Sequence, residues 1–356
     1  MRRRSAVALP GAALLILLTA LPTLACGGLI GPNGAVNLVR TTTLAAYGNG
    51  VEHYVTSFEF AGVGGGQFGS LIPLPDIPSK IERAGGWTLQ RLILETDPVV
   101  DQTSFRAAAA GAPSASAEVI QQVRIDALDI TVLRGGGTAV GQWATDHGFR
   151  LPPDAPEVLD FYAQRSPIFL AAVFDGGAAK ERGQRTGDGT PVQLTIPTDE
   201  PWVPIRILGL GKTPSERVRA NVYLMTDARP NLLPLPSVSN GLAITHSAAA
   251  TEDLLNDLRR DKNTGWIPRH AWLTKIAVDG DAATLTHDLA IDPTGTTVPN
   301  AIDAGFGVGT TAQPLPAEGS IQPADVRRVA VAFGFVVASL AAIGGLAMGR
   351  PTTPAR

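Results

Sequence analysis

Histidines at predicted strand ends, one of them followed by a carboxylate, are the side chains of this 356-residue sequence that best suit acid–base chemistry. His246 and His270 stand at the ends of segments that the residue pattern predicts as strands, and His287 is followed directly by Asp288. An imidazole that a carboxylate orients can serve as a general base near neutral pH. If these strand ends converge, the four side chains would ring a cleft. If they do not, they are hydrogen-bonded strand-end residues, and the sequence leaves both interpretations open.

Motifs for other kinds of site are weak. Histidine and cysteine do not recur at the i, i+4 spacing of a metal site on one element, and no Gly-x-Ser-x-Gly elbow marks a nucleophile. The glycine-rich run at 64–69 matches Gly-x-Gly-x-x-Gly, but Pro73 and Pro75 prevent the helix that a dinucleotide site needs. The single cysteine, Cys26, cannot cycle through an internal disulfide, which disfavours a redox role. The sequence therefore predicts no metal and no cofactor.

Two further patterns concern binding surfaces. Trp266 and Trp272 flank Arg269 and His270, which is consistent either with a ligand platform or with core packing of the rings. Prolines at predicted strand ends place those strands at sheet edges, where they present an edge to a partner strand or protect against such pairing. These prolines are Pro73, Pro75, Pro197, Pro201 and Pro204.

The N-terminal segment has the layout of a secretory signal peptide. Three arginines at 2–4 precede an apolar run at 6–21, and small residues lead to a cleavage site after Ala25. Residues 1–25 are therefore predicted to be removed, the alternative being an uncleaved anchor helix. Cleavage would make Cys26 the first mature residue, which suggests lipid attachment or, alternatively, a free thiol.

The C-terminal segment predicts a membrane anchor. Residues 329–348 carry no charge, and as a helix they would span about 30 Å, the thickness of a bilayer core. We expect one transmembrane helix over 327–350, a cytoplasmic tail at 351–356 and a flexible Gly/Thr/Pro-rich tether over 293–326. Small residues at four-residue spacing in the helix are consistent with helix self-association or with the general abundance of alanine and glycine.

The region between the two ends, residues 26–292, is predicted to be an α+β, strand-dominated and mostly antiparallel exported domain. Gly48-Asn49-Gly50 and Asp279-Gly280 are expected at hairpin turns, and residues 119–133 as one strand. Helices are expected over 87–95, 139–147 and 251–260, and another begins at Asp154. A low-complexity run at 107–117 marks a possible division of the domain.

Several stretches together resemble one bacterial family. They include the segment before Tyr47, the passage that ends at Pro75, the segments around 129–172, PVQLTIPTDEPWVPIRI at 191–207 and RHAWLTKIAVDGDAATLTHDLAID at 269–292. They are similar to the exported family catalogued as domain of unknown function 2330, especially its actinobacterial members. The resemblance implies an envelope location and a single-pass C-terminal anchor, and it implies no activity. Some relatives carry paired cysteines where this chain has only Cys26.

Composition and anchor together lead to two functional hypotheses. The net charge of −3 gives no basic footprint for nucleic acid. The first hypothesis is a membrane-anchored, extracytoplasmic, non-enzymatic binding or scaffolding module that acts through an envelope protein partner. The second is an envelope hydrolase with a His/Asp site built from His246, His287 and Asp288.

Overall fold

The computed structural model describes residues 28–31, 34–35, 38–60, 68–97, 118–175, 181, 183 and 190–308. The predicted signal peptide, the processing site at Ala25 and Cys26, the possible division at 107–117 and the predicted span at 327–350 lie outside these residues. Within them, no helix is both long enough and apolar enough to cross a bilayer. The signal peptide, the division and the membrane span therefore stay predictions.

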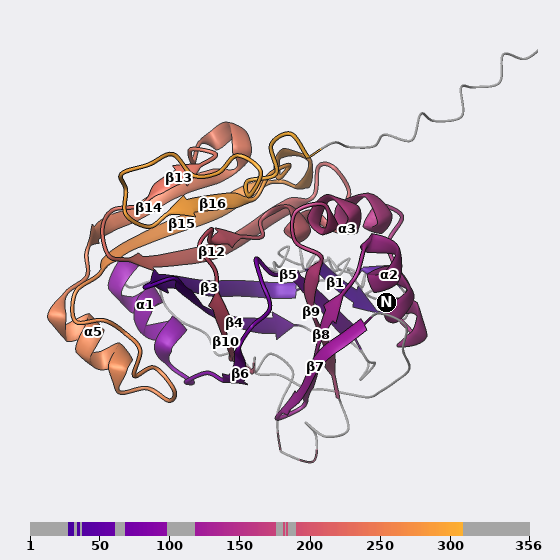
Figure 1. The fold of residues 1–356 in the computed structure, drawn as a ribbon, viewed down its shortest axis with the longest axis horizontal. Coiled ribbons are helices and arrows are strands. Elements are labelled where there is room, and N and C mark those ends of the chain that lie inside the picture. The colour runs from indigo at the N-terminus through magenta and orange to yellow at the C-terminus, as the bar shows by residue number, and fades with distance from the viewer. Residues whose placement is uncertain are drawn as a thin grey trace, which may run out of the picture. The chain divides into compact units, whose positions relative to one another are not determined.

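Two large sheets form the frame of the described part (Figure 1). Sheet A has the spatial order β2 (Gly34–Ala35), β1 (Gly28–Gly31), β5 (Phe68–Pro73), β9 (Ile168–Phe174), β8 (Leu128–Arg134) and β7 (Glu118–Ile125). Sheet B has the order β14 (Leu242–Ala249), β15 (Trp272–Asp281), β12 (Arg217–Thr226), β3 (Leu38–Gly48), β4 (Val51–Phe60), β10 (Val192–Pro197) and β6 (Lys80–Arg83).

A smaller sheet C completes the set, with the order β11 (Trp202–Val203), β16 (Leu289–Asp292) and β13 (Asn231–Leu233). Every strand pair among the described residues is antiparallel except β12 with β3. The prediction of a strand-dominated, mostly antiparallel fold is thus confirmed.

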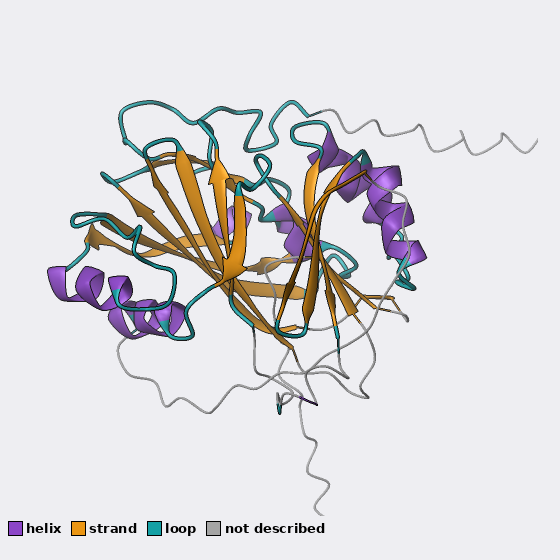
Figure 2. Ribbon diagram, turned by 60° about the horizontal axis from the view of Figure 1, so that its bottom comes forward, coloured by secondary structure: helices purple, strands orange, loops and turns teal. Residues whose placement is uncertain are grey.

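Alternation of side chains along the strands gives each large sheet two buried faces. The inner face of sheet B carries Leu194, Val222 and Ile276, which belong to the same buried cluster as Ile130 and Leu170 of sheet A. The sheets therefore share one apolar core. The helices α2 (Gly137–Asp146) and α3 (Ala155–Ala163) lie outside sheet A, on the side away from sheet B (Figure 2).

The outer face of sheet B is covered by α1 (Thr88–Thr96) and α5 (Glu252–Arg259) (Figure 2). Leu92 of α1 and Leu254 and Leu258 of α5 pack with Leu44 and Leu273 of the sheet in a second buried cluster. Leu89 also belongs to this cluster, three residues before Leu92, and Leu254 and Leu258 are four apart, so one stripe of each helix meets the strands. Both helices lie within two residues of their predicted bounds.

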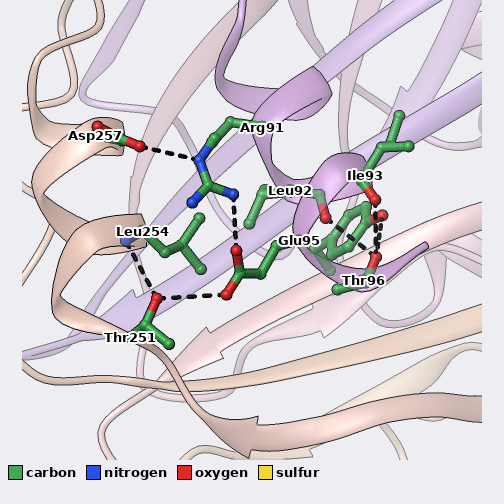
Figure 3. A network of polar contacts seen from close by, with 9 residues as sticks. Arg91, Leu92, Ile93, Glu95, Thr96, Thr251, Leu254 and Asp257 are labelled. Carbon is green, nitrogen blue, oxygen red and sulfur yellow. Dashed lines mark hydrogen bonds and ion pairs between the residues drawn. The ribbon is translucent and has the colours of Figure 1, made fainter. Parts of the chain in front are cut away.

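Polar contacts fix the two helices to each other (Figure 3). Arg91 of α1 donates to Asp257 of α5 at 3.1 Å and to Glu95 at 2.8 Å. Thr251 caps α5 by accepting from the N–H of Leu254 at 3.2 Å, and its hydroxyl donates to Glu95 at 3.3 Å. This network sets the orientation of the helix pair over the sheet.

Two local predictions differ from the structure. Asp279-Gly280 lies inside β15, where the two residues pair with Arg219 and Val218, so the predicted hairpin turn is wrong. A Cβ at Gly280 would lie 2.8 Å from the Cα of Gly241, so glycine serves a close approach of backbones there. The expected strand at 119–133 is a hairpin of β7 and β8 with Asp126 at φ +53° in its turn.

The packed unit extends beyond residue 292 to Val308. Ala304 is fully buried, and its carbonyl accepts from the N–H of Asp288 at 3.0 Å. Gly305, at φ +84°, lies so close to the ring of Phe161 that a Cβ would clash with it. The first sixteen residues of the predicted tether are therefore part of the domain, and residues 309–326 lie outside the described part.

Candidate pocket and buried ion pair

A pocket of about 260 Å³ lies at one end of sheet B, on the face that α1 and α5 cover elsewhere. The turn between β3 and β4 forms one side of it, the end of β12 another, and the segment at 266–268 a third. Ala46, Val51, Met225 and Pro268 supply apolar lining. The turn itself confirms the prediction at 48–50, because Asn49 and Gly50 have φ values of +54° and +73°.

One wall of the pocket is a stacked pair of rings. The rings of His53 and Trp266 lie 4.0 Å apart with an interplanar angle of 4°. Burial lowers the pKa of His53 to about 4, and the nearby charge of Glu82 opposes that shift only in part. The imidazole is therefore neutral at pH 7. Its Nδ1 and the Nε1 of Trp266 are buried without a hydrogen-bond partner among the described residues.

Two carboxylates stand at the turn beside this wall. Asp227 Oδ1 lies 3.9 Å from the position that a Cβ would take at Gly48, and Asp199 Oδ1 lies 3.8 Å from that position at Gly50. Both side chains are exposed, and neither has an ion-pair or hydrogen-bond partner for its carboxylate in the described part of the chain. Together with burial, the charge of Asp199 raises the pKa of Tyr47, which lines the pocket. The pocket thus combines an apolar interior with uncompensated negative charge at its rim.

Asp288, a candidate from the sequence, lies far inside the fold. Its side chain is fully buried, and its Oδ1 accepts from Tyr162 Oη at 2.8 Å and from the N–H groups of Ile205 and Arg206 at 2.7 and 2.9 Å. Its other oxygen pairs with the guanidinium of Arg165, which is 2% exposed. With both oxygens engaged, this carboxylate holds the backbone at the start of η1 (Arg206–Gly209).

The aromatic groups around Arg165 complete this buried centre. Its guanidinium carbon lies 4.5, 5.0 and 4.7 Å from the ring centroids of Phe161, Tyr162 and Trp202. Burial and the charge of Asp288 raise the pKa of Tyr162 well above its ordinary value, so the phenol stays protonated and donates. The centre therefore joins α3, η1 and sheet C through one fully desolvated ion pair.

The three candidate histidines are on three different segments of the chain. His287 stacks on Phe306 with ring centroids 4.0 Å apart, and its Nδ1 lies 2.8 Å from the hydroxyl of Thr286. His246 is on β14 opposite Lys275, whereas His270 is exposed just before β15. No contact among the described residues joins His246 or His270 to the pair at 287–288. Asp288 is fully buried and its oxygens are bound to Tyr162 and Arg165, so no described hydrogen bond joins it to any of these histidines.

A protein-family model described as an uncharacterized protein conserved in bacteria, DUF2330, matches residues 76–292. The chain belongs to this family. The resemblance inferred from the sequence is confirmed, and the family description names no activity. The matched region contains both members of the Arg165–Asp288 ion pair and the three rings around Arg165. Of the pocket, it contains Asp227 and Trp266 but not the turn between β3 and β4.

Two other comparisons add no functional information. A search of curated proteins found no match. Among solved structures, a crystal structure of baculovirus P35 aligns at a TM-score of 0.38 and 8% identity, over 73% of this chain and 97% of that one. A likeness at this score carries no argument about the fold or the function of this DUF2330 chain.

The sequence does not distinguish His53, Met225 or Asp227 from other residues, and it is consistent with either a platform or a core position for Trp266. No spacing connects these residues, because three segments far apart in the chain bring them together. The sequence signal for this site is the position of single residues at strand ends. The Gly48-Asn49-Gly50 turn and the aspartates at 199 and 227 all stand at strand ends, where loops gather functional side chains.

Proposed function

We propose that this protein is a non-enzymatic binding module of the cell envelope, held at the outer face of the cytoplasmic membrane by a single helix over 327–350. Its ligand would bind in the pocket beside the turn between β3 and β4. The observation that supports binding is the unpaired carboxylate of Asp227 at the rim of an apolar pocket walled by Trp266 and a neutral His53. The hydrolase alternative would need His246 beside His287 and Asp288, and no observation favours it.

The chemistry of the pocket favours an organic cation with a small apolar body. An apolar group would remove water from the half-buried Val51 and Pro268 and from the ring wall, at roughly 25 cal/mol per Å² of buried apolar surface. A cationic group at the rim would face Asp227, and Asp199 would add to the negative potential. A free amine and a basic side chain of a partner protein share this chemistry.

Binding of benzylamine to the full chain tests the charge requirement. The neutral isostere benzyl alcohol should bind at least about tenfold more weakly, because it lacks the attraction to Asp227, and Asp227→Asn should weaken benzylamine binding by a similar factor. Isothermal titration of the detergent-solubilised chain measures both. Asp253→Asn, at the exposed start of α5, is the matched control and should change nothing. Equal affinity of the wild type for both probes would disprove the proposed ligand class.

Location is tested by ending the chain after residue 308, where the packed unit ends. We expect the full chain in the membrane fraction, and the shortened chain in the periplasm or the medium, because it lacks the predicted helix. Immunoblots of both fractions measure this. Retention of the shortened chain would contradict a sole C-terminal anchor. Repeating the fractionation with Cys26→Ser then shows whether lipidation at the N-terminus holds it.

A further inference from the structure

The edge strand β14 has an unusual composition for an exposed sheet edge. It has eight residues, LAITHSAA, and it pairs only with β15 among the described strands. It contains no proline and none of the residues Asp, Glu, Lys and Arg. A bulge interrupts the pairing between Ile244 and His246, so His246–Ala249 is the uninterrupted stretch at its C-terminal end. Free backbone groups on such an edge are a template for another strand.

The other sheet edges in the described part carry features that discourage pairing. At the far side of sheet B, β6 has only four residues, and three of them are charged. In sheet A, β7 carries Glu118 and Arg124, and β2 has only two residues. Short length, charge and bulges are the usual protection of a sheet edge. The strand β14 is neither short nor charged, and its one bulge leaves His246–Ala249 regularly paired.

Side chains around β14 are also open to solvent. Ile244 is 44% exposed, and Val238, in the short helix that leads into the strand, is 94% exposed. Leu235 before it is 75% exposed. Isolated exposed apolar residues are ordinary, but these three fall within ten residues of one another, in β14 or in the segment directly before it.

We propose that β14 is the interface through which two copies of this chain associate, with the two β14 strands antiparallel across a two-fold axis. The second copy is favoured as the occupant because two copies of an uncharged strand can pair without repulsion between like charges. Two-fold pairing places equivalent segments opposite each other, and any charged residue near the axis would then face its own copy. The small side chains of Ser247, Ala248 and Ala249 allow close approach. This interface is on a different strand from the pocket and does not depend on its ligand.

Cysteine cross-linking of the full chain in native membranes tests the interface. Ser247→Cys, treated with a short bismaleimide, should give a covalent dimer, because antiparallel partners near the axis lie within about 5 Å of each other. Gln122→Cys, on the exposed edge of β7, is the matched control and should give no dimer above the wild-type background from Cys26. The same thermal unfolding curve for both variants shows that each is folded.

A second variant tests whether the strand edge itself is used. Ala249→Lys in the Ser247→Cys background brings two positive charges near the axis and should reduce the cross-linked dimer at least about fivefold. Thr138→Lys, exposed on α2, should leave it unchanged. Failure of folded Ser247→Cys to form a dimer overturns the proposal. A cross-link to a different protein also overturns it, in favour of a hetero-partner strand.

Discussion

Replacing Asp288 by alanine is expected to lower the free energy of unfolding by about 3–5 kcal/mol, the cost of removing one member of a buried ion pair. The guanidinium of Arg165 would stay buried at 2% exposure without its counter-charge. The N–H groups of Ile205 and Arg206 and the hydroxyl of Tyr162 would lose their acceptor as well. Each lost partner adds to the destabilisation, because a buried donor without an acceptor pays its full desolvation cost.

Urea unfolding followed by circular dichroism measures this effect against a matched surface aspartate. Asp279 also pairs with arginines, Arg217 and Arg219, but all three side chains are about half exposed. Asp279→Ala should therefore cost no more than about 1 kcal/mol. An equal loss for the two variants would show that Asp288 does not hold the fold as the structure implies.

A double replacement separates charge from packing. Arg165→Met with Asp288→Leu removes both charges and fills the site with apolar atoms. Its loss should be smaller than the sum of the two single losses, because neither charge is left unpaired. A strictly additive result would indicate that the two side chains contribute independently.

Local signals in the sequence predicted the helices well. Leucines at helical spacing and Thr251 as a cap place α5 within one residue of its observed bounds, because a helix is specified by residues close together in the chain. The turn in the β7–β8 hairpin escaped prediction because it contains Asp126 in place of a glycine. Gly280 led to the opposite error, a predicted turn inside a continuous strand. Close packing against Gly241 requires this glycine, and no turn is present there.

The candidate site depended on long-range contacts that no local pattern encodes. Asp288 stands beside His287 in sequence and so suggested a catalytic pair, yet its partner Arg165 lies 123 residues earlier. The pocket likewise joins the turn at 48–50 to Asp227 and Trp266. Residue types show where polar groups occur in the chain. Only the fold shows which of these groups already have hydrogen-bond or ion-pair partners.

The second large effect concerns Glu52, which is fully buried on the inner face of sheet B between Tyr47 and Ile196 on the neighbouring strands. Neither carboxylate oxygen has a hydrogen-bond partner among the described residues. Burial without compensation raises the pKa of Glu52 from 4.5 to about 8. The folded chain therefore holds this proton at neutral pH, whereas the unfolded chain has released it.

The sign of the pH dependence follows from this difference. Between pH 4.5 and 8 the folded state binds more protons than the unfolded state, so the free energy of unfolding falls as the pH rises through this window. The contribution of Glu52 is complete below pH 4.5 and lost above pH 8, and the total change is at most about 5 kcal/mol. Burial lowers the pKa of His53, so His53 makes the free energy of unfolding rise with pH, opposite to Glu52. This contribution is the same in every variant that keeps His53.

Glu52→Gln isolates the effect, because the amide fills the same space and does not ionise. The difference in unfolding free energy, variant minus wild type, should rise by several kcal/mol between pH 5 and pH 9, and the contribution of His53 cancels in it. Urea titrations at four or five pH values measure this difference. Glu252→Gln, at an exposed position on α5, should give a flat difference. A flat difference for Glu52→Gln would mean that water or a counter-charge reaches Glu52, and that the core between the two sheets is not dry at this point.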